Sequence, residues 1–511
     1  MTVIGIDLGT TNSVVAVTDS NGVTTTIAAR DGARIVPSVI HFPAGGDIVV
    51  GDRAKSMAAV EPERVASLFK RGMGANTFLA NGDDFAVDGK VWRPEELSSL
   101  VLKKLKQIAE EHLGGSVHRA VVTVPAYFGE SERSATRDAA ELAGLQVVRI
   151  LNEPTAAAIV HGLDSRARGA NVLVFDLGGG TFDVTIMRVE DNADMMVLAT
   201  GGDRKLGGAD FDAIIIELMA EHARKEAGID ILSEAWMIQD ARDKAEDMKK
   251  ELSSAETSTR TLSTGARPLP FTLSRAEFEA AIGDALSDVS DTVEVTLEES
   301  GIAAGDIDTV LMVGGSSRIP AFQKVLTSLI GREPEFSKNL DEDVARGAAV
   351  LATKLSGNAD PRSELATMSI PQDIASHGLG MTTVRDARGM EEMNSIIIPS
   401  GHAVPASGSG VFCTVEDGQT GIWVRINEGD EESLDFVRQI GEGHARFGRP
   451  VPAGYPMRVE LSYTADQIVR LLAYDGESGN LIGEVTVERE GALSSVQKRD
   501  AMAAIAELGV Q

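Results

Sequence analysis

Two short segments of this 511-residue chain end an apolar run with Asp-Leu-Gly and then threonine: Val3–Thr11 (VIGIDLGTT) and Val172–Thr181 (VLVFDLGGGT). A run rich in β-branched residues indicates a buried strand, and Asp-Leu-Gly after it indicates a tight turn. Glycine lets backbone N–H groups come close to a ligand. Such N–H groups bind phosphate, and carboxylates suit Mg²⁺. The repeat therefore predicts two matched turns around one nucleotide; the alternative is two ordinary strand-turn-strand units.

The bulk composition narrows the class of protein. The formal charge of -29 argues against a nucleic-acid surface or an anionic-membrane patch. The single cysteine, Cys413, excludes an intramolecular disulfide framework and fits a reducing compartment; we expect it to pack as a small apolar residue. No apolar stretch is long enough to span a bilayer, and the N-terminus enters a strand without a signal sequence. A cytoplasmic protein is expected.

Strands alternate with long amphipathic helices from Met1 to about Gly357, which predicts an α/β architecture with mixed sheets. The predicted strands are Val3–Asp7, Ser13–Thr18, Arg119–Val124, Val147–Leu151, Val172–Asp176, Val184–Val189 and Thr309–Val313. The predicted helices are Pro94–Leu113, Glu130–Ala143, Pro154–Gly162, Asp210–Glu226, Glu234–Leu252 and Arg275–Glu299. The repeated phrase suggests two related lobes.

The composition changes after this region. Ser356–Ser369 is polar and small, as linkers are. From about Ser395 short alternating runs are separated by turn signals, which predicts an all-β module. Its predicted strands are Val411–Val415, Gly421–Ile426, Met457–Tyr463, Ile468–Ala473 and Leu481–Val487. The last predicted element is a helix over Ser494–Leu508.

Walker A and complete G-x-G-x-x-G sequences are both missing, so a phosphate site must be built in another way. Six segments appear in an order that resembles the ATPase domain of the DnaK-type 70-kDa heat-shock chaperones, members of the actin/sugar-kinase superfamily. They are Ile4–Ser13 (IGIDLGTTNS), Val124–Phe128 (VPAYF), Leu151–Gly162 (LNEPTAAAIVHG), Val174–Asp183 (VFDLGGGTFD), Leu206–Asp212 (LGGADFD) and Met312–Pro320 (MVGGSSRIP). Leu68–Gly74 and Glu96–Leu102 look most like the HscC branch.

The resemblance implies a fold and its division. The fold class is α/β, with a two-lobed actin-like ATPase domain over 1–357. A linker over 358–372 follows, then an all-β sandwich that binds substrate over 373–490, and a short helical remnant of a lid over 491–511. Because so little chain follows the sandwich, no lid bundle is expected to close over a bound client.

The resemblance also implies catalytic roles. Asp7 and Asp176 orient the waters around Mg²⁺, and Thr181 belongs to the phosphate cradle. Lys70 contacts the γ-phosphate and the attacking water, although Lys70 beside Arg71 would otherwise suggest a solvated basic pair. Glu153 positions water and Mg²⁺; the alternative is a first-turn glutamate favoured by the helix dipole. ATP or ADP and Mg²⁺ are thus the implied ligands, and K⁺ is admitted as a further ion.

A larger set matches the nucleotide-binding positions of the family. Glu246, Lys249 and Lys250 lie on one predicted helix face, for which a solvent-exposed charged face is the alternative. The full set is Gly9, Thr10, Thr11, Asn12, Gly178, Gly179, Gly180, Gly207, Gly208, Glu246, Lys249, Lys250, Ser253, Gly314, Gly315, Ser316, Arg318 and Asp341.

Further matches concern coupling and clients. Pro125 and Arg133 match the family's interdomain switch, whereas Arg149, Asn152 and Thr155 match its docking region for J-domain cochaperones. Asp373 matches the linker's acidic residue, but Pro371 has no N–H for strand pairing, which puts the coupling of the two domains in question. In the sandwich, Phe412, Ile422 and Val424 are candidates for a peptide pocket, and plain core positions are the alternative.

These implications favour an ATP-dependent chaperone that couples ATP hydrolysis to the binding of extended apolar polypeptides. A J-domain cochaperone is implied as a partner and an exchange factor is admitted. Neither nucleic acid nor membrane is expected. Two alternatives stay open: a nucleotide-gated binding protein for one dedicated partner with weak turnover, and a small-molecule kinase of the same superfamily, against which the β module argues.

Overall fold

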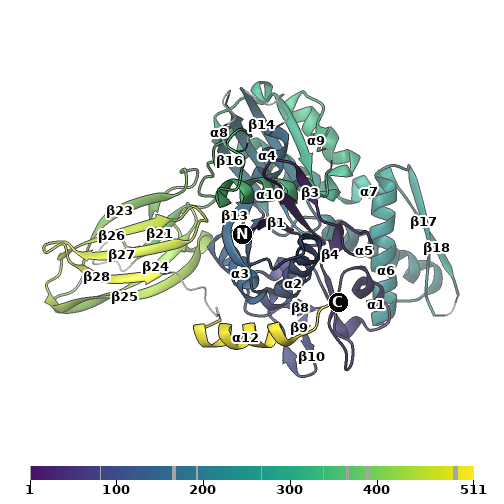
Figure 1. Ribbon diagram of the computed structural model, residues 1–511, viewed down its shortest axis with the longest axis horizontal. Coiled ribbons are helices and arrows are strands. Elements are labelled where there is room, and N and C mark those ends of the chain that lie inside the picture. Colours follow the sequence, from purple (N-terminus) through teal and green to yellow (C-terminus); the bar gives the residue numbers. More distant parts are fainter. Residues whose placement is uncertain are drawn as a thin grey trace.

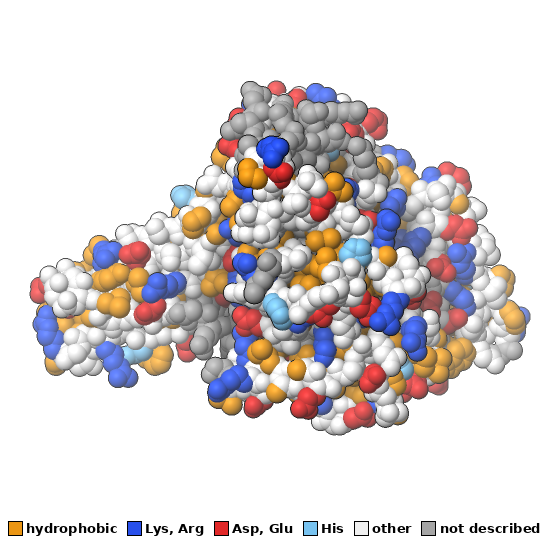
Figure 2. Space-filling view, viewed as in Figure 1, with side chains coloured by type: hydrophobic (Ala, Val, Ile, Leu, Met, Phe, Trp, Pro, Cys, Tyr) orange, Lys and Arg blue, Asp and Glu red, His pale blue; other side chains and the backbone are white. Residues whose placement is uncertain are grey.

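The structure is a computed structural model, and it describes residues 2–80, 82–163, 169–190, 194–265, 267–337, 339–363, 365, 368–385, 391–486 and 493–511. An α/β part with two lobes carries an elongated β-sandwich at one side (Figure 1). This confirms the predicted fold class. Acidic and basic side chains are interspersed over the face shown in Figure 2. Among the described residues, no helix has the length and hydropathy needed to cross a membrane.

Lobe I is built on a mixed sheet in the order β13-β12-β1-β2-β3, with β4 also paired to β2. Strands β1, β12 and β13 run parallel, whereas β1 and β2 form an antiparallel hairpin. Helices α2 and α3 cover one face, where Ile4 and Ile6 join the core. The strands are β1 (Val3–Leu8), β2 (Asn12–Thr18), β3 (Thr24–Thr26), β4 (Ile35–Pro37), β12 (Arg119–Val124) and β13 (Gln146–Asn152); the helices are α2 (Pro94–Leu113) and α3 (Glu130–Leu142).

A smaller subdomain of lobe I borders the cleft between the lobes. Its sheet has the order β6-β5-β7, and helix α1 follows β6 directly. The elements are β5 (Val39–His41), β6 (Val49–Val50), α1 (Asp52–Met57), η1 (Pro62–Arg64), β7 (Val65–Ser67), η2 (Phe69–Gly72), β8 (Leu79–Ala80), β9 (Asp83–Asp84), β10 (Ala86–Val87) and β11 (Lys90–Val91).

Lobe II repeats the design of lobe I with a sheet in the order β16-β15-β14-β19-β20. The β14–β15 hairpin corresponds to β1–β2, and β14 runs parallel to β19. Its strands are β14 (Ala170–Leu177), β15 (Phe182–Val189), β16 (Met195–Asp203), β17 (Thr257–Leu262), β18 (Leu269–Ser274), β19 (Thr309–Val313) and β20 (Glu335–Phe336). Its helices are α5 (Gly208–Ala227), α6 (Ala235–Leu252), α7 (Arg275–Ala281), α8 (Gly283–Ser300), η3 (Ala304–Asp306), η4 (Gly315–Arg318) and α9 (Pro320–Ile330).

Helices α4 (Glu153–Leu163) and α10 (Asp343–Ser356) pack together between the two lobes. Helix α10 lies on β1 and β2, while α4 contacts both β13 and β14. Small residues such as Ala156, Ala348 and Ala352 are fully buried there. Such side chains let helices approach closely, so the lobes share one buried layer beneath the cleft.

The sandwich packs two four-stranded sheets, in the orders β22-β21-β24-β25 and β23-β26-β27-β28, around one apolar core. Its elements are β21 (Leu379–Val384), β22 (Glu392–Ile398), β23 (Ala406–Cys413), β24 (Gln419–Glu428), η5 (Leu434–Phe436), β25 (Arg438–Val451), β26 (Pro456–Tyr463), β27 (Val469–Asp475) and β28 (Leu481–Thr486). Cys413 is exposed at the end of β23, so the expectation of a packed cysteine was wrong.

Most predicted elements are found within one or two residues of their expected ends. The predicted helix Arg275–Glu299 is instead broken at Ile282, because that buried residue leaves the helical conformation and Gly283 begins α8. Val487, predicted to end the last strand, lies outside the described residues, as do Ala366 and Thr367 of the predicted linker.

The linker docks on lobe II despite Pro371. Gln372 forms a parallel bridge with Met196: its N–H donates to Met195 O at 3.0 Å, and its carbonyl accepts from Val197 N–H at 3.0 Å. Pro371 lies one position before this pair, so its missing N–H removes no bond from the pair. The lost strand bond that put domain coupling in question is therefore not found at this pair.

The last helix, α12 (Ser495–Glu507), does not lie over the sandwich. It packs against α3 of lobe I, below the α/β part in Figure 1, and the tail that follows it reaches β6. The predicted lid remnant therefore packs on lobe I in this structure. Residues 491 and 492 of that prediction lie outside the described residues.

Candidate functional site

The two predicted turns face each other across the cleft. The β1–β2 turn presents Thr10 and Thr11, and the β14–β15 turn presents Gly179 and Gly180. A Cβ added to Gly179 would lie 2.3 Å from Thr11 Cγ2, and one added to Gly180 would lie 2.6 Å from Thr10 Cγ2. Glycine is required here because any side chain would separate the turns. The predicted opposition of the two turns is present in the structure.

Each turn is closed by its own hydrogen bonds. Gly178 N–H donates to Thr181 O at 3.0 Å, and Gly9 N–H donates to Ser13 Oγ at 3.2 Å. Ser38, the residue that follows β4, donates from Oγ to Gly9 O at 2.8 Å and so restrains the first turn. The remaining N–H groups of these turns are oriented by rigid hairpins, as a phosphate cradle requires.

Acidic side chains from both lobes gather around one lysine beneath the turns. Lys70 in η2 is 2% exposed, and its Nζ lies 2.7 Å from Glu153 Oε1 at the start of α4. Asp7 is the next-to-last residue of β1 and accepts a hydrogen bond from Thr123 Oγ1 at 3.0 Å, whereas Asp176 holds the same position in β14 and is 6% exposed. The predicted catalytic residues thus lie together, although Lys70 and Glu153 are far apart in sequence.

The crowding of carboxylates changes their acidity. Burial, followed by repulsion from Glu153, raises the pKa of Asp7 to about 7. Burial also raises the pKa of Asp176 well above its usual range, with Glu153 and Asp183 contributing. Such raised values are typical of functional sites, and a cation at this position would reverse the effect.

Asp183 belongs to this group, yet sequence reasoning did not assign it. It lies directly opposite Asp176 in the hairpin register, and its Oδ1 accepts from Tyr127 N–H at 2.9 Å. Burial and then Glu153 raise its pKa to about 7. Its Oδ2 is buried without a hydrogen-bond partner among the described residues. The signal was available, because Asp183 ends the quoted Val174–Asp183 motif.

The second turn is supported by helices of lobe II. Gly208 N–H donates to Gly178 O at 3.0 Å, and Ser316 Oγ donates to the same oxygen at 2.9 Å. Lys249 is mostly buried and binds Gly208 O at 2.6 Å and Asp212 at 2.7 Å. Gly314, at φ 80°, lies so close to Asp176 that an added Cβ would be 2.5 Å from Oδ1. The β14–β15 turn is therefore bordered by five of the predicted residues: Gly207, Gly208, Gly314, Ser316 and Lys249.

Lys55 and Arg71 of lobe I each form an ion pair with lobe II. Lys55 of α1 lies 2.6 Å from Glu246 of α6, whose other oxygen accepts from Lys250 at 2.6 Å. Arg71 lies 2.9 Å from Asp210 at the start of α5. The alternative of Lys70–Arg71 as a solvated pair is thus not what the structure has. Sequence reasoning missed Lys55, Arg71 and Asp210, because an ion pair between lobes leaves no local pattern.

The remaining predicted nucleoside residues are placed along the edges of the cleft. Arg318 and Asp341 lie 3.5 Å apart, and both are about half exposed. Ser253 Oγ donates to Lys249 O at 3.2 Å within its own helix. Lys250, Asn12 and Gly315 are exposed, and Gly9 and Thr11 are half-buried.

A chain of contacts leads from the acidic group to the sandwich. Arg133 is buried and donates to Asn152 Oδ1 at 2.7 Å and to Phe128 O at 2.8 Å, in the loop that begins with Pro125. The same loop binds the sandwich, because Ser376 Oγ donates to Ala126 O at 2.7 Å. Tyr127, which binds Asp183, stacks edge-on against His377 with ring centroids 4.5 Å apart.

The predicted docking residues contact the sandwich and the linker directly. Thr155 Oγ1 donates to Asp373 Oδ1 at 3.2 Å, and burial raises the pKa of Asp373. Arg149 Nε lies 3.3 Å from Asp466, which also accepts from Arg137 and from Ile150 N–H. Sequence reasoning missed Asp466, because a single acid in a surface turn carries no signal.

A second contact caps helix α3 from the other domain. Glu428 Oε1 accepts from Glu130 N–H, the first residue of α3, at 3.1 Å. A carboxylate is favoured at a helix N-terminus. Nearby, Glu132 accepts from Arg204 at 2.8 Å and from Arg438 at 2.7 Å, so this acid joins lobe I, lobe II and the sandwich.

The peptide-pocket candidates divide into two groups. Val424 has 0% exposed surface and belongs to the sandwich core in this conformation, which supports the alternative interpretation of that residue. Phe412 and Ile422 are half-buried at the margin of the same core. These two side chains retain a surface that a ligand could contact.

Comparison with known proteins accounts for this arrangement. The family model described as Hsp70 protein matches residues 3–508. The protein named chaperone protein DnaK from Thermotoga neapolitana is 38% identical over 485 residues, covering 93% of this chain and 79% of the relative. The DnaK proteins of Thermotoga petrophila and Thermotoga maritima match with the same identity and coverage. A match of this extent, over a two-lobed α/β part with a β-sandwich, shows that the chain belongs to the Hsp70 family.

Proposed function

We propose that this protein is an ATP-dependent chaperone that hydrolyses ATP to ADP and phosphate between its lobes. Nucleotide state would control the binding of extended apolar polypeptide segments in the sandwich. The observation that carries the proposal is the pair of Asp-terminated turns facing each other above the buried Lys70–Glu153 pair. We assign the ATPase domain to 1–357, the linker to 358–372 and the substrate-binding sandwich to 373–490.

The acidic group fits a hydrated Mg²⁺ ion held through water by Asp7 and Asp176. Asp7, Asp176, Glu153 and Asp183 are close together with Lys70 as the nearby cation, and Asp183 Oδ2 is buried without a partner among the described residues. Mg²⁺ would neutralise charge that develops on the phosphates and keeps several of its waters when bound. We propose that these contacts run through water, because Mg²⁺ keeps much of its water shell when it binds to proteins. K⁺ remains a further candidate.

The chain's own groups would position the phosphates and the attacking water and would stabilise the charge that develops during the reaction. The N–H groups of Gly179 and Gly180 would hold phosphate oxygens, while Gly178 N–H closes the turn on Thr181 O. Thr10, Thr11 and Thr181 offer hydroxyl groups beside them. Lys70 places a fixed positive charge next to the transferred phosphate, and Glu153 both orients Lys70 and accepts a hydrogen bond from the attacking water. Phosphoryl transfer depends mainly on such positioning and charge stabilisation.

Communication between the domains would follow the contacts around residues 125–128. Asp183 binds Tyr127, while Ala126 and Tyr127 contact Ser376 and His377 of the sandwich. The linker pairs with β16 at the same time. A change at the acidic group can therefore shift this loop and alter sandwich docking.

We further infer the partners and location from the family. Clients are unfolded or extended polypeptides, with Phe412 and Ile422 as contact candidates. A J-domain cochaperone would dock near Arg149, Asn152 and Thr155, and an exchange factor would act on the cleft. Neither nucleic acid nor membrane is a proposed ligand, and the cytoplasm is the proposed location. The HscC branch is supported by Leu68–Gly74 and Glu96–Leu102.

The test is whether apolar peptides raise the steady-state ATPase rate of the full chain. We expect stimulation that Asp466→Asn diminishes, because this change weakens the contacts from Arg137 and Arg149. Asp435→Asn removes an exposed acid of the same domain and should leave stimulation intact. A flat response across a peptide library, with ATP still hydrolysed, would instead favour a nucleotide-gated binder for one dedicated partner.

A further inference from the structure

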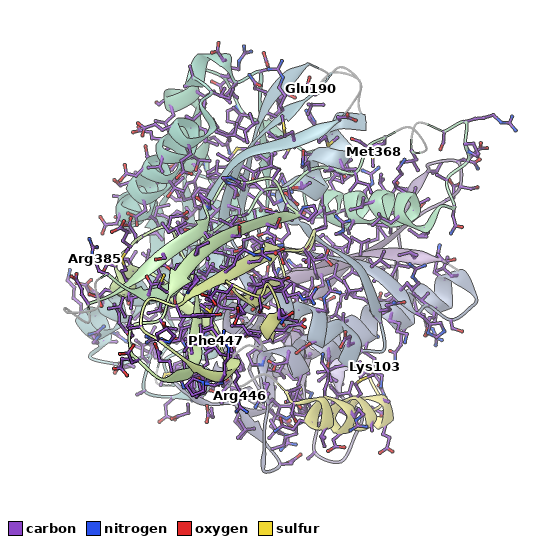
Figure 3. All side chains as sticks on the ribbon, turned by 90° about the vertical axis from the view of Figure 1, so that its left-hand side faces the viewer. Lys103, Glu190, Met368, Arg385, Arg446 and Phe447 are labelled. Carbon is purple, nitrogen blue, oxygen red and sulfur yellow. The ribbon has the colours of Figure 1, made fainter. Side chains whose placement is uncertain are left out.

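The C-terminal segment, residues 495–511, packs on lobe I and not over the sandwich that precedes it in sequence. Helix α12 crosses lobe I beside α3, and residues 509–511 continue to β6 at the edge of the cleft (Figure 1). Figure 3 shows Lys103 of α2 directly beside α12. The contacts of this segment connect the end of the chain with elements near residues 47–50 and 103.

Both ends of α12 are anchored by lysines. Lys498, near its start, lies between Asp138 and Glu141 of α3, at 2.5 and 2.7 Å. Lys103 donates to the carbonyl oxygens of Ile505 at 2.6 Å, Ala506 at 3.1 Å and Leu508 at 2.7 Å. The last carbonyls of a helix lack partners within it, so Lys103 satisfies the C-terminal end of α12.

Apolar side chains bury the segment in the core of lobe I. Ile505 is 1% exposed and Val510 is 9% exposed, and both belong to the same cluster as Ile48 and Val50. Burying such side chains is favourable, because it removes apolar surface from water. The segment is therefore packed in lobe I rather than resting on its surface.

The tail adds an edge strand to the β6-β5-β7 sheet. Ile48 N–H donates to Gly509 O at 2.9 Å, Gln511 N–H donates to Ile48 O at 2.9 Å, and Val50 N–H donates to Gln511 O at 3.0 Å. Ile48 and Val510 form a parallel bridge. An added strand satisfies an otherwise free sheet edge and restrains the strand beside it.

The strand that the tail restrains, β6, leads directly into helix α1, which carries one of the ion pairs between the lobes. Gly51 follows β6, its N–H binds Val39 O at 3.0 Å, and α1 begins at Asp52. Lys55 on α1 then reaches Glu246 of lobe II at 2.6 Å. Only a short stretch separates the tail-paired Val50 from the residue that joins the lobes.

We propose that the C-terminal segment sets the rate at which bound nucleotide leaves the cleft. By pairing with β6 it holds α1, and thereby keeps the Lys55–Glu246 contact formed. Detachment of the tail frees β6 and α1, so the lobes separate more readily and the nucleotide escapes faster. This inference rests on the proposed function, because it requires a nucleotide between the lobes.

The experiment measures dissociation of a fluorescent ADP analogue, chased with unlabelled ADP, from the full-length protein. Val510→Asp places a charge at a buried position of the tail, whereas Val496→Asp makes the same change at a position of α12 that is 55% exposed. We expect Val510→Asp to release the analogue about two- to fivefold faster, the range that an ion pair of intermediate exposure supports. Val496→Asp should leave the rate unchanged.

The same change made in a Lys55→Met protein distinguishes an effect through the Lys55–Glu246 contact from a general loss of stability. In a Lys55→Met protein the contact is already lost, so Val510→Asp should add little further acceleration. Unchanged release in Val510→Asp, or equal acceleration in both backgrounds, would overturn the inference. If Val510→Asp does not fold, Lys103→Met, which removes the donors at the end of α12, replaces it in the same comparison.

The starting measurement distinguishes the two proposals. If the unmodified protein does not bind the ADP analogue, the proposed nucleotide site fails, and this inference fails with it. If the analogue binds and its release is independent of the tail, only the inference fails. Faster amide exchange at Ile48 and Val50 in Val510→Asp would show directly that the strand pairing had been lost.

Discussion

Replacing Lys70 with methionine should nearly abolish ATP hydrolysis while ATP still binds. Lys70 is 2% exposed and its Nζ lies 2.7 Å from Glu153, among Asp7, Asp176 and Asp183. At an effective dielectric constant of 20, a charge pair at that distance attracts by about 6 kcal/mol, which desolvation largely offsets. The net role of Lys70 is therefore to complement charge that develops during the reaction.

The expected loss of hydrolysis rate follows from other enzymes in which one group that stabilises charge in the transition state was removed. Loss of one group that stabilises a transition state lowers the chemical rate by about 10²–10³-fold, or ~3–4 kcal/mol. ATP affinity should change much less, because in our proposal the turns at residues 9–11 and 178–181 hold the phosphates, chiefly through backbone groups. Single-turnover hydrolysis with excess protein measures the chemical step, and nucleotide titration measures binding.

The free energy of unfolding provides an independent measurement of the Lys70–Glu153 ion pair. Breaking a buried ion pair by removing one partner destabilises by about 3–5 kcal/mol, because the other charge remains buried. Without nucleotide, Lys70→Met should thus unfold at a lower temperature, and Lys70→Met/Glu153→Gln should recover part of that loss. Lys106→Met, whose Nζ binds Gly144 O outside the cleft, is the matched control. Undiminished single-turnover hydrolysis in Lys70→Met would refute the role assigned to this lysine.

Two further predictions concern the metal and the cleft. Asp176→Asn should raise the Mg²⁺ concentration needed for hydrolysis, because it removes one carboxylate of the proposed ion shell; a normal rate at limiting Mg²⁺ would contradict that shell. Glu246 should keep its stabilising charge throughout the neutral range. Burial opposes its ionisation, but hydrogen bonds from Lys250 and Lys55 lower its pKa from 4.5 to about 2. Its stabilisation is therefore present above pH 4.5 and is lost only as the pH falls towards 2. Because Glu246 stays charged, its titration should not change the rate of ADP release between about pH 6 and 8. High salt should make release faster, because it screens the Lys55–Glu246 ion pair. Glu246→Gln should abolish that salt effect, and a salt response that persists in Glu246→Gln would assign it to another contact.

Sequence reasoning succeeded where the relevant physics is local. The strands that carry Asp7 and Asp176 near their ends are apparent from apolar runs and glycine turns, and the structure has both, each one residue longer at its end than predicted. It could not decide whether Pro371 interrupts the linker's pairing, because the residue that pairs with lobe II is Gln372, and only the docked register shows this. Asp183 was missed even though its motif was quoted, since its position opposite Asp176 depends on hairpin register.

The sequence alone determined the repeated phosphate turns, the alternation of strands and helices, and the family to which these motifs belong. These features depend on neighbouring residues, through side-chain periodicity and the backbone freedom of glycine. Tertiary structure decided which distant charges meet: Lys70 with Glu153, Lys55 with Glu246, and Asp466 with Arg149. It also placed residues 509–511 beside β6. Such contacts depend on how lobes, sandwich and C-terminal segment pack, and a pair of opposite charges hundreds of residues apart leaves no periodic pattern in the chain.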